Sequence, residues 1–134
     1  MLNRVRYLSL LVTIALAFSV HAQQKEVRVA LVIGNSAYKN APLPNPVNDA
    51  RAMNEALQRA GFTVMLRTDV DLRDMMAAVR DFGAKLQQGG VGIFYFAGHG
   101  MQIKGRNYLI PVGAVIERED EVAYAAVEIG RAHV

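Results

Sequence analysis

The stretch VGIFYFAGHG, residues 91–100, decides the fold class of this 134-residue chain. Residues 91–97 form an unbroken apolar run with glycines on both sides. Such a run predicts a strand buried on both faces, as at the centre of a parallel sheet. Because glycines end the strand, His99 is expected at the edge of that sheet, with little around its ring to crowd it.

Strand and helix patterns alternate ahead of this stretch. Further strands are predicted at residues 27–33 and 62–66, both rich in apolar residues. Apolar residues at helical spacing predict one helix that Asn48 caps, with Asp49 in its first turn, and that Gly61 ends. A second helix is expected to begin at Thr68 or Asp71 and to end at residues 89–90.

The order of these elements predicts an α/β fold. A short hairpin is expected after the third strand, with residues 101–104 against 107–110 and Gly105 in the turn. Strands that alternate with helices form parallel sheets through right-handed crossovers, with helices on both faces. We therefore expect a three-layer αβα sandwich with a mostly parallel sheet.

Composition excludes several classes of protein. Hydrophobic residues make up 52% of the chain and charged residues 20%, which excludes intrinsic disorder. The chain has no cysteine, so these residues hold no disulfide, thiolate zinc site or cysteine nucleophile. Metal binding is not expected at His99 either, because no second histidine or carboxylate lies at ligand spacing, and no cofactor is predicted.

Residues 1–22 are predicted to be a signal peptide cleaved after Ala22. Arg4 and Arg6 precede an apolar run at residues 7–20, which small residues end; this run is too short for a membrane span. The protein is thus expected to be secreted or periplasmic, without membrane contact after cleavage. Of the 15 Lys and Arg residues, those two would be removed, so the formal net charge would fall from +3 to +1. A near-neutral chain with no basic stripe is not expected to bind nucleic acid.

Residues 128–134 are predicted to be non-native. Their sequence, EIGRAHV, matches a possible translation of a common sequencing adapter and ends without a helix stop signal. The native part of the chain is therefore expected to be a single domain at residues 23–127, truncated from a longer gene.

Polar residues follow two of the predicted strands, at Asn35 and at His99. Ligands and reacting groups in open parallel sheets lie at the carboxyl ends of the strands, so these residues mark a candidate site. A histidine there can accept a proton near neutral pH, and the amide of Gly100 can help hold an oxyanion. The alternative for His99 is a structural histidine that hydrogen-bonds a loop.

Four segments, taken in order, resemble the large-subunit region of bacterial caspase-like (metacaspase-related) cysteine peptidases. They are VALVIGN at residues 29–35 followed by Tyr38, LPNPVNDA at 43–50, FYFAGHG at 94–100 and NYLIP at 107–111. The resemblance implies a caspase-like sandwich that stops after the third core strand and a hairpin. It also implies proteolysis of a peptide or protein substrate.

The resemblance implies specific roles for four residues. His99 matches the catalytic histidine, and Gly100 matches the residue whose amide stabilises the tetrahedral intermediate. Asp49 falls where relatives place an acidic residue in the pocket for an Arg or Lys side chain, and Asn35 would line the same cleft. The alternatives are that Asp49 is only a first-turn carboxylate of its helix and that Asn35 is only a turn residue.

The missing cysteine departs from the family pattern. Caspases place the nucleophilic cysteine about 50 residues after the histidine, and only 35 residues follow His99 here. The chain alone is therefore expected to be inactive, with the cysteine beyond Val134. The alternatives are a non-catalytic caspase-like protein that binds peptides and, less well matched by Asn35-Ser36, a flavodoxin-like ligand domain.

Overall fold

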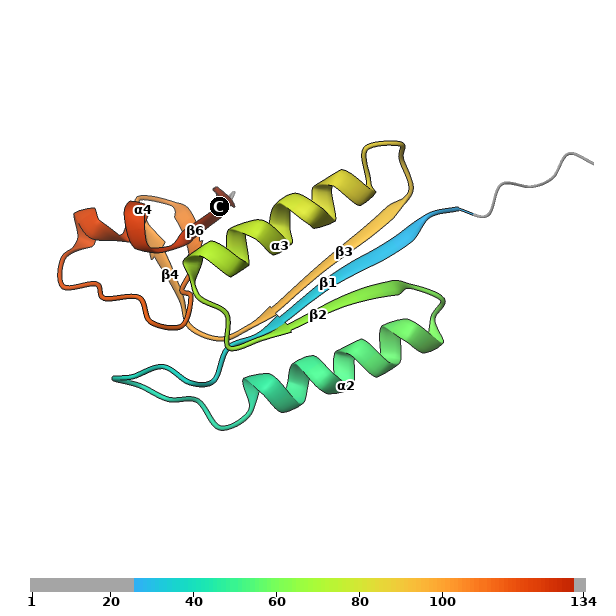
Figure 1. The fold of residues 1–134 in the computed structure, drawn as a ribbon. Coiled ribbons are helices and arrows are strands. Elements are labelled where there is room, and N and C mark those ends of the chain that lie inside the picture. Colours follow the sequence, from blue (N-terminus) through green and yellow to red (C-terminus); the bar gives the residue numbers. More distant parts are fainter. Residues whose placement is uncertain (1–25, 132–134) are drawn as a thin grey trace, which may run out of the picture.

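A computed structural model describes residues 26–131 (Figure 1). The predicted signal peptide and its cleavage site lie outside the described residues. Within them, no helix is both long enough and apolar enough to cross a membrane.

The described chain alternates strands and helices and ends in a smaller antiparallel sheet. In chain order the elements are β1 (Arg28–Gly34), α2 (Pro46–Arg59), β2 (Thr63–Thr68), α3 (Leu72–Lys85), β3 (Val91–Ala97), β4 (Gly100–Ile103), β5 (Arg106–Leu109), the 3-10 helix η1 (Glu119–Glu121), α4 (Val122–Ala125) and β6 (Val127–Arg131).

The first three strands form a parallel sheet in the order β2-β1-β3. Figure 1 shows α2 covering one face of this sheet and α3 the other. This arrangement confirms the predicted three-layer αβα sandwich (Figure 1).

β1 is the central strand of this sheet, and both of its faces are buried. Leu31 and Ile33 pack on the α3 side with Met75, and Ala30 and Val32 pack on the α2 side. All of these side chains are fully buried. The two-residue period of a strand sends alternate side chains to opposite faces, so one apolar run supplies both halves of the core.

The prediction that residues 91–97 form the central strand is wrong. β3 lies at one edge of the parallel sheet, and Phe94 on it is 38% exposed. Within the described residues no strand pairs with its outer edge. An apolar run indicates a buried environment, but it does not state which neighbours supply the burial.

One of the two predicted helix starts is confirmed and the other is wrong. Asp71 caps α3, because its carboxylate accepts a hydrogen bond from the amide of Asp74 at 2.8 Å. The cap predicted at Asn48 is wrong, since α2 begins two residues earlier at Pro46, whose fixed φ suits a first helical position. Asp49 does lie in the first turn, as expected.

The hairpin forms as predicted, and a third strand completes its sheet. Lys104 and Gly105 make the turn between β4 and β5 with φ of 50° and 74°, the left-handed geometry of tight hairpin turns. β6 pairs antiparallel with β5 and includes residues 128–131 of the segment predicted to be non-native. Their origin stays a prediction.

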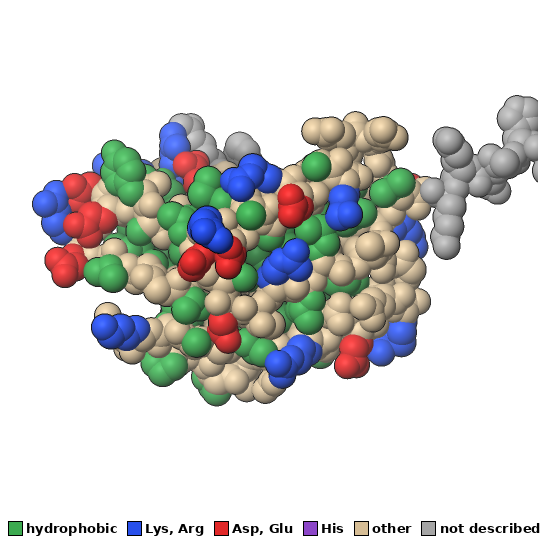
Figure 2. All heavy atoms as spheres, viewed as in Figure 1, with side chains coloured by type: hydrophobic (Ala, Val, Ile, Leu, Met, Phe, Trp, Pro, Cys, Tyr) green, Lys and Arg blue, Asp and Glu red, His purple; other side chains and the backbone are tan. Residues whose placement is uncertain are grey.

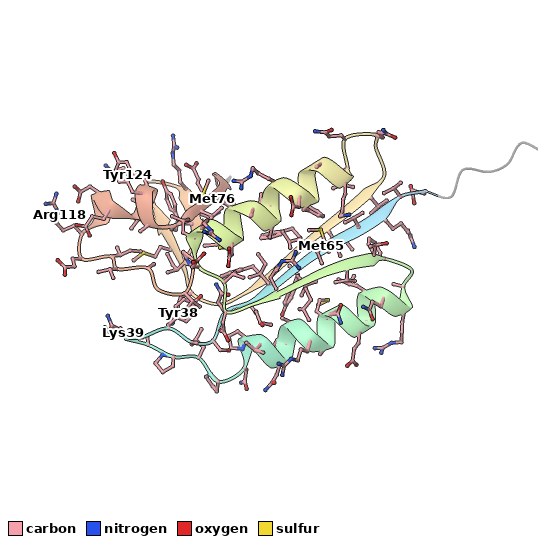
Figure 3. All side chains as sticks on the ribbon, viewed as in Figure 1. Tyr38, Lys39, Met65, Met76, Arg118 and Tyr124 are labelled. Carbon is pink, nitrogen blue, oxygen red and sulfur yellow. The ribbon has the colours of Figure 1, made fainter. Side chains whose placement is uncertain are left out.

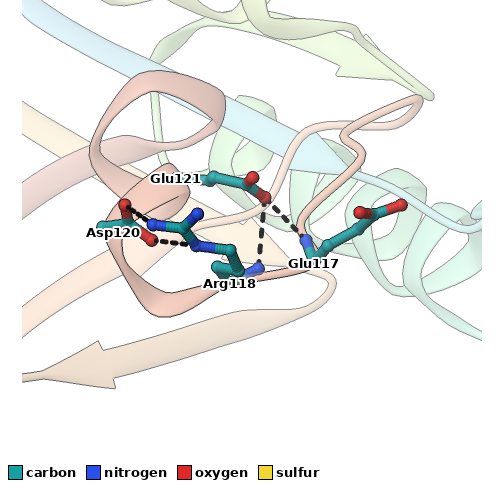
Figure 4. Close-up of polar contacts among 4 residues, drawn as sticks. All are labelled: Glu117, Arg118, Asp120 and Glu121. Atoms are coloured by element: carbon teal, nitrogen blue, oxygen red, sulfur yellow. Dashed lines mark hydrogen bonds and ion pairs between the residues drawn. The ribbon is translucent and has the colours of Figure 1, made fainter.

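The acidic run at residues 117–121 is satisfied by its own neighbours (Figure 4). The Glu121 carboxylate accepts hydrogen bonds from the amides of Glu117 and Arg118 at 2.8 and 3.1 Å, and Arg118 pairs with Asp120. Across residues 26–131 no group of three or more His, Asp or Glu side chains is arranged to hold a metal ion. This run is a capped helix start exposed to solvent.

Gly34 tests how closely α2 must approach β1. A Cβ added there would lie 2.6 Å from the Cβ of Ala50 and closer still to the carbonyl oxygen of Pro46. We expect Gly34→Ala to lower the free energy of unfolding by about 1–3 kcal/mol in urea denaturation, because the helix must move. The control is Gly83→Ala on α3, where a Cβ meets nothing within 4 Å, so that its effect on stability should be neutral or favourable. Equal effects of the two substitutions would contradict the close approach.

Candidate active site

The carboxyl ends of β1 and β3 lie side by side. Gly34 pairs with Ala97, and the amide of Asn35 donates a hydrogen bond to the carbonyl oxygen of Ala97 at 2.8 Å. The β1–α2 loop therefore leaves the sheet beside the segment that carries His99. This is the edge at which Asn35 and His99 predicted a site.

The ring of His99 is held by the β1–α2 loop. Its Nε2 lies 2.7 Å from the carbonyl oxygen of Ala41. Because a carbonyl oxygen only accepts hydrogen bonds, this contact places a proton on Nε2 and leaves Nδ1 as the basic nitrogen. The structural alternative for His99 and its predicted role as a base are thus compatible, since the loop contact selects the tautomer that a base needs.

Tyr38 contacts both the ring and the main chain of His99. Its hydroxyl accepts a hydrogen bond from the His99 amide at 3.0 Å and donates one to the carbonyl oxygen of Ile110 at 2.8 Å. The two rings meet edge to face, with their centroids 4.4 Å apart. The carbonyl oxygen of His99 accepts from the Ile110 amide at 2.9 Å, so the main chain of His99 is fixed on both sides.

A cavity of about 350 Å³ opens beside His99. Its walls come from the β1–α2 loop, the segment after β3 and the loop after β5, at residues 38–41, 99–101, 110 and 113–116. Most of these side chains are apolar, and Lys39 carries a full charge among them. Figure 3 shows Tyr38 near the end of β1 and Lys39 farther out on the same loop. Such a cavity can hold a side chain of a peptide next to the histidine.

Of the four predicted site residues, the structure brings His99 and Gly100 together. Both line this cavity, and Gly100 is exposed at the start of β4. Asp49 is exposed in the first turn of α2 and is not among the residues that line the cavity. At this position its carboxylate interacts favourably with the helix dipole. This is the alternative role given for Asp49, that of a first-turn carboxylate.

Asn35 is fully buried and does not line the cavity. Its side-chain oxygen accepts a hydrogen bond from the Val70 amide at 3.0 Å, and its side-chain nitrogen donates to the Val70 carbonyl oxygen at 3.4 Å. These contacts join the end of β1 to the chain leaving β2. Asn35 therefore makes a buried structural contact at the end of β1, and its predicted place in the cleft stays a prediction.

Sequence reasoning missed three residues that support the histidine, namely Tyr38, Ala41 and Asp69. Asp69 has a φ of 51°, and its carboxylate accepts hydrogen bonds from the amides of Ser36 and Ala37 at 2.7 and 2.9 Å. A backbone carbonyl such as that of Ala41 leaves no trace in a sequence. Tyr38 and Asp69 carried one available signal, because each is a polar residue just beyond a predicted strand end.

Burial raises the pKa of Tyr38, although hydrogen bonds from the His99 amide and from Asn35 partly offset the effect. The fold therefore favours the neutral phenol, whereas an unfolded tyrosine ionises near pH 10. The stability from this preference is fully present below about pH 10 and is lost as the pH rises through the raised pKa. Wild type should therefore lose more unfolding free energy than Tyr38→Phe between about pH 9.5 and 11.5, as urea denaturation measures.

Tyr124 offers the matched control for this pH dependence, because its side chain is 84% exposed. Tyr124→Phe should follow wild type across the same range. A Tyr38→Phe protein whose stability falls in parallel with that of wild type would refute the raised pKa.

Comparison with known proteins places the site in a family. The sequence matches the caspase domain family over residues 27–124. Over 88 residues it is 35% identical to the mucosa-associated lymphoid tissue lymphoma translocation protein 1 of Homo sapiens and to the Mus musculus homolog of that protein. Each match covers 65% of this chain and 11% of the relative, so the chain spans about a tenth of the length of these relatives. The match includes both strand ends that form the site, and the chain therefore belongs to the caspase domain family of peptidases.

Proposed function

We propose that this chain is the histidine-bearing part of a cysteine-type endopeptidase that cleaves peptide or protein substrates. The observation that carries the proposal is the geometry of His99, whose Nε2 is held by the Ala41 carbonyl oxygen at the wall of a cavity that can hold a peptide side chain. Membership of a peptidase family supports the same reaction class. The nucleophilic cysteine would lie outside these 134 residues, so the chain alone would be inactive.

In the proposed reaction, Nδ1 of His99 takes the proton of the cysteine thiol. The thiolate attacks the carbonyl carbon of the scissile bond, and the Gly100 amide helps to hold the oxyanion that forms. The C–N bond breaks as the imidazolium returns its proton to the leaving amine, which leaves a thioester. A water molecule, deprotonated by His99, then hydrolyses the thioester and frees the thiol.

The site leaves two possible origins for the preference at the residue before the scissile bond, Asp49 or the cavity beside His99. Asp49 was expected to favour Arg or Lys before the scissile bond, and that role stays a prediction. The cavity beside His99 has Lys39 and no carboxylate among its lining residues. Cleavage of otherwise identical peptides with Arg, Leu or Asp at that position, by wild type and Asp49→Asn, separates a basic preference set by Asp49 from one set elsewhere.

We propose that the protein acts outside the cytoplasm and binds peptides or proteins. Secretion or periplasmic export rests on residues 1–22, and the absence of nucleic-acid binding rests on the near-neutral charge expected after cleavage. On the face drawn in Figure 2, basic and acidic side chains are interspersed, and the basic ones do not gather into a stripe. This distribution supports a peptide or protein partner over a nucleic acid.

The second candidate function is peptide binding without cleavage, favoured by the absence of cysteine from the whole sequence. Reading the source gene past the codon for Val127 decides between the two. A cysteine after the next apolar strand supports the peptidase, whereas a strand without one supports the binding protein.

The decisive variant is His99→Ala in the full-length mature protein. With fluorogenic peptides as substrates, we expect kcat/KM to fall by about 10²–10⁴-fold, because the thiol loses its proton acceptor. Asn48→Ala, an exposed residue on α2, serves as the control and should keep wild-type activity. Wild-type cleavage that survives His99→Ala would exclude His99 as the base.

A further inference from the structure

We propose that Tyr38 is a positioning residue for His99 and acts through its hydroxyl group. The inference rests on the proposed peptidase function, and it assigns the Tyr38 hydroxyl a role in that reaction through its bond to His99. Within residues 26–131 the hydroxyl is the one side-chain group that hydrogen-bonds the His99 amide, and the ring of the same residue packs against the imidazole. Backbone and ring of the base therefore depend on one side chain.

Gly98 shows that the chain makes room for this contact. A Cβ at position 98 would lie 2.5 Å from the Tyr38 hydroxyl oxygen and 2.7 Å from the ring of Phe96. Any larger residue before His99 would push the hydroxyl away from the His99 amide. The glycine in the FAGHG segment is thus explained by the space that Tyr38 occupies.

The loop that carries Tyr38 also carries the second contact to His99. Tyr38 bonds the His99 main chain, and Ala41, three residues later, bonds its Nε2. Asp69 fixes the start of this loop because its carboxylate accepts hydrogen bonds from two of the loop's amides. A shift of the loop would therefore move the main-chain and ring contacts of the base together, and an error of about 1 Å in a reacting group can cost about 100-fold in rate.

The hydroxyl has a function that the ring alone cannot supply. It accepts from one chain segment and donates to another, so it joins the end of β3 to the end of β5 at Ile110. Phenylalanine would keep the edge-to-face packing but leave the His99 amide and the Ile110 carbonyl oxygen without this partner. Because Tyr38 is only 8% exposed, water would not fully replace its hydroxyl.

The test is Tyr38→Phe in the full-length mature protein, assayed with the best fluorogenic peptide. We expect kcat to fall by about 3–30-fold while KM stays within about two-fold, because the hydroxyl bonds only His99 and Ile110 and phenylalanine keeps the ring of this cavity-lining residue. Tyr95→Phe is the matched control: this half-buried tyrosine on β3 packs on the α2 side, away from His99, and its loss should leave both constants unchanged. An unchanged kcat in folded Tyr38→Phe would overturn the proposal.

A second measurement does not depend on cleavage. Hydrogen exchange of the peptide segment that contains the His99 amide should be about 5-fold or more faster in Tyr38→Phe than in Tyr95→Phe, because the amide loses its acceptor. If wild type cleaves nothing, the proposed function fails, and this exchange rate alone decides whether the hydroxyl holds His99. Equal exchange in the two variants would refute the contact.

Should Tyr38→Phe fail to fold, 3,5-difluorotyrosine at position 38 replaces it. Fluorination also lowers the pKa of the phenol, so the assay is run at a pH low enough to keep the hydroxyl protonated. The protonated hydroxyl is then a weaker acceptor and a stronger donor, so the contact to the His99 amide weakens while the contact to Ile110 remains. A fall in kcat without a change in KM would support the proposal, and wild-type kinetics would contradict it.

Discussion

Burial of β1 between two helices is the constraint on which the rest of the structure depends. Leu31, Val32 and Ile33 are wholly removed from water, and burial of each such side chain stabilises the fold by about 1.5–3 kcal/mol. With alternate residues committed to opposite faces, a shift of the strand by one position would send each set of side chains to the other helix, where it would not fit the existing packing. That fixed register places Gly34 opposite Ala97 and so determines which residues meet at the carboxyl edge.

Polar contacts at this edge connect the buried sheet to the candidate site. Asn35 joins β1 to the chain after β2 through Val70, and Asp69 joins that same chain to the start of the β1–α2 loop. The loop then reaches His99 through Tyr38 and Ala41. None of these links requires a charged pair, and no buried side-chain nitrogen or oxygen atom in the described residues lacks a hydrogen-bond partner. These contacts hold the main chain and the ring of His99 in one arrangement.

The sequence alone was sufficient for the layers and for the residue at the centre of the site. Apolar periodicity gave the three strands, both helices and the hairpin, and glycine placement predicted His99 at the sheet edge. The predicted helix start at Asn48 was wrong because the geometry of Pro46 outweighed a preferred capping residue. The predicted central position of β3 was wrong because a run of apolar residues does not reveal which strands lie beside it. Tyr38, Ala41 and Asp69 were missed because their role exists only when segments distant in sequence meet.

The outer edge of β3 sets the order in which a peptidase of this design could become active. A strand added in parallel there would lie about 4.8 Å away and would end beside Gly98 and His99. Under the proposed function, His99 is synthesised first, and a nucleophile on such a strand would join it only once the sheet had grown by one more strand. Hydrolytic activity would then arise from completion of the sheet, so that a nascent chain would hold the histidine before it had a thiol to deprotonate.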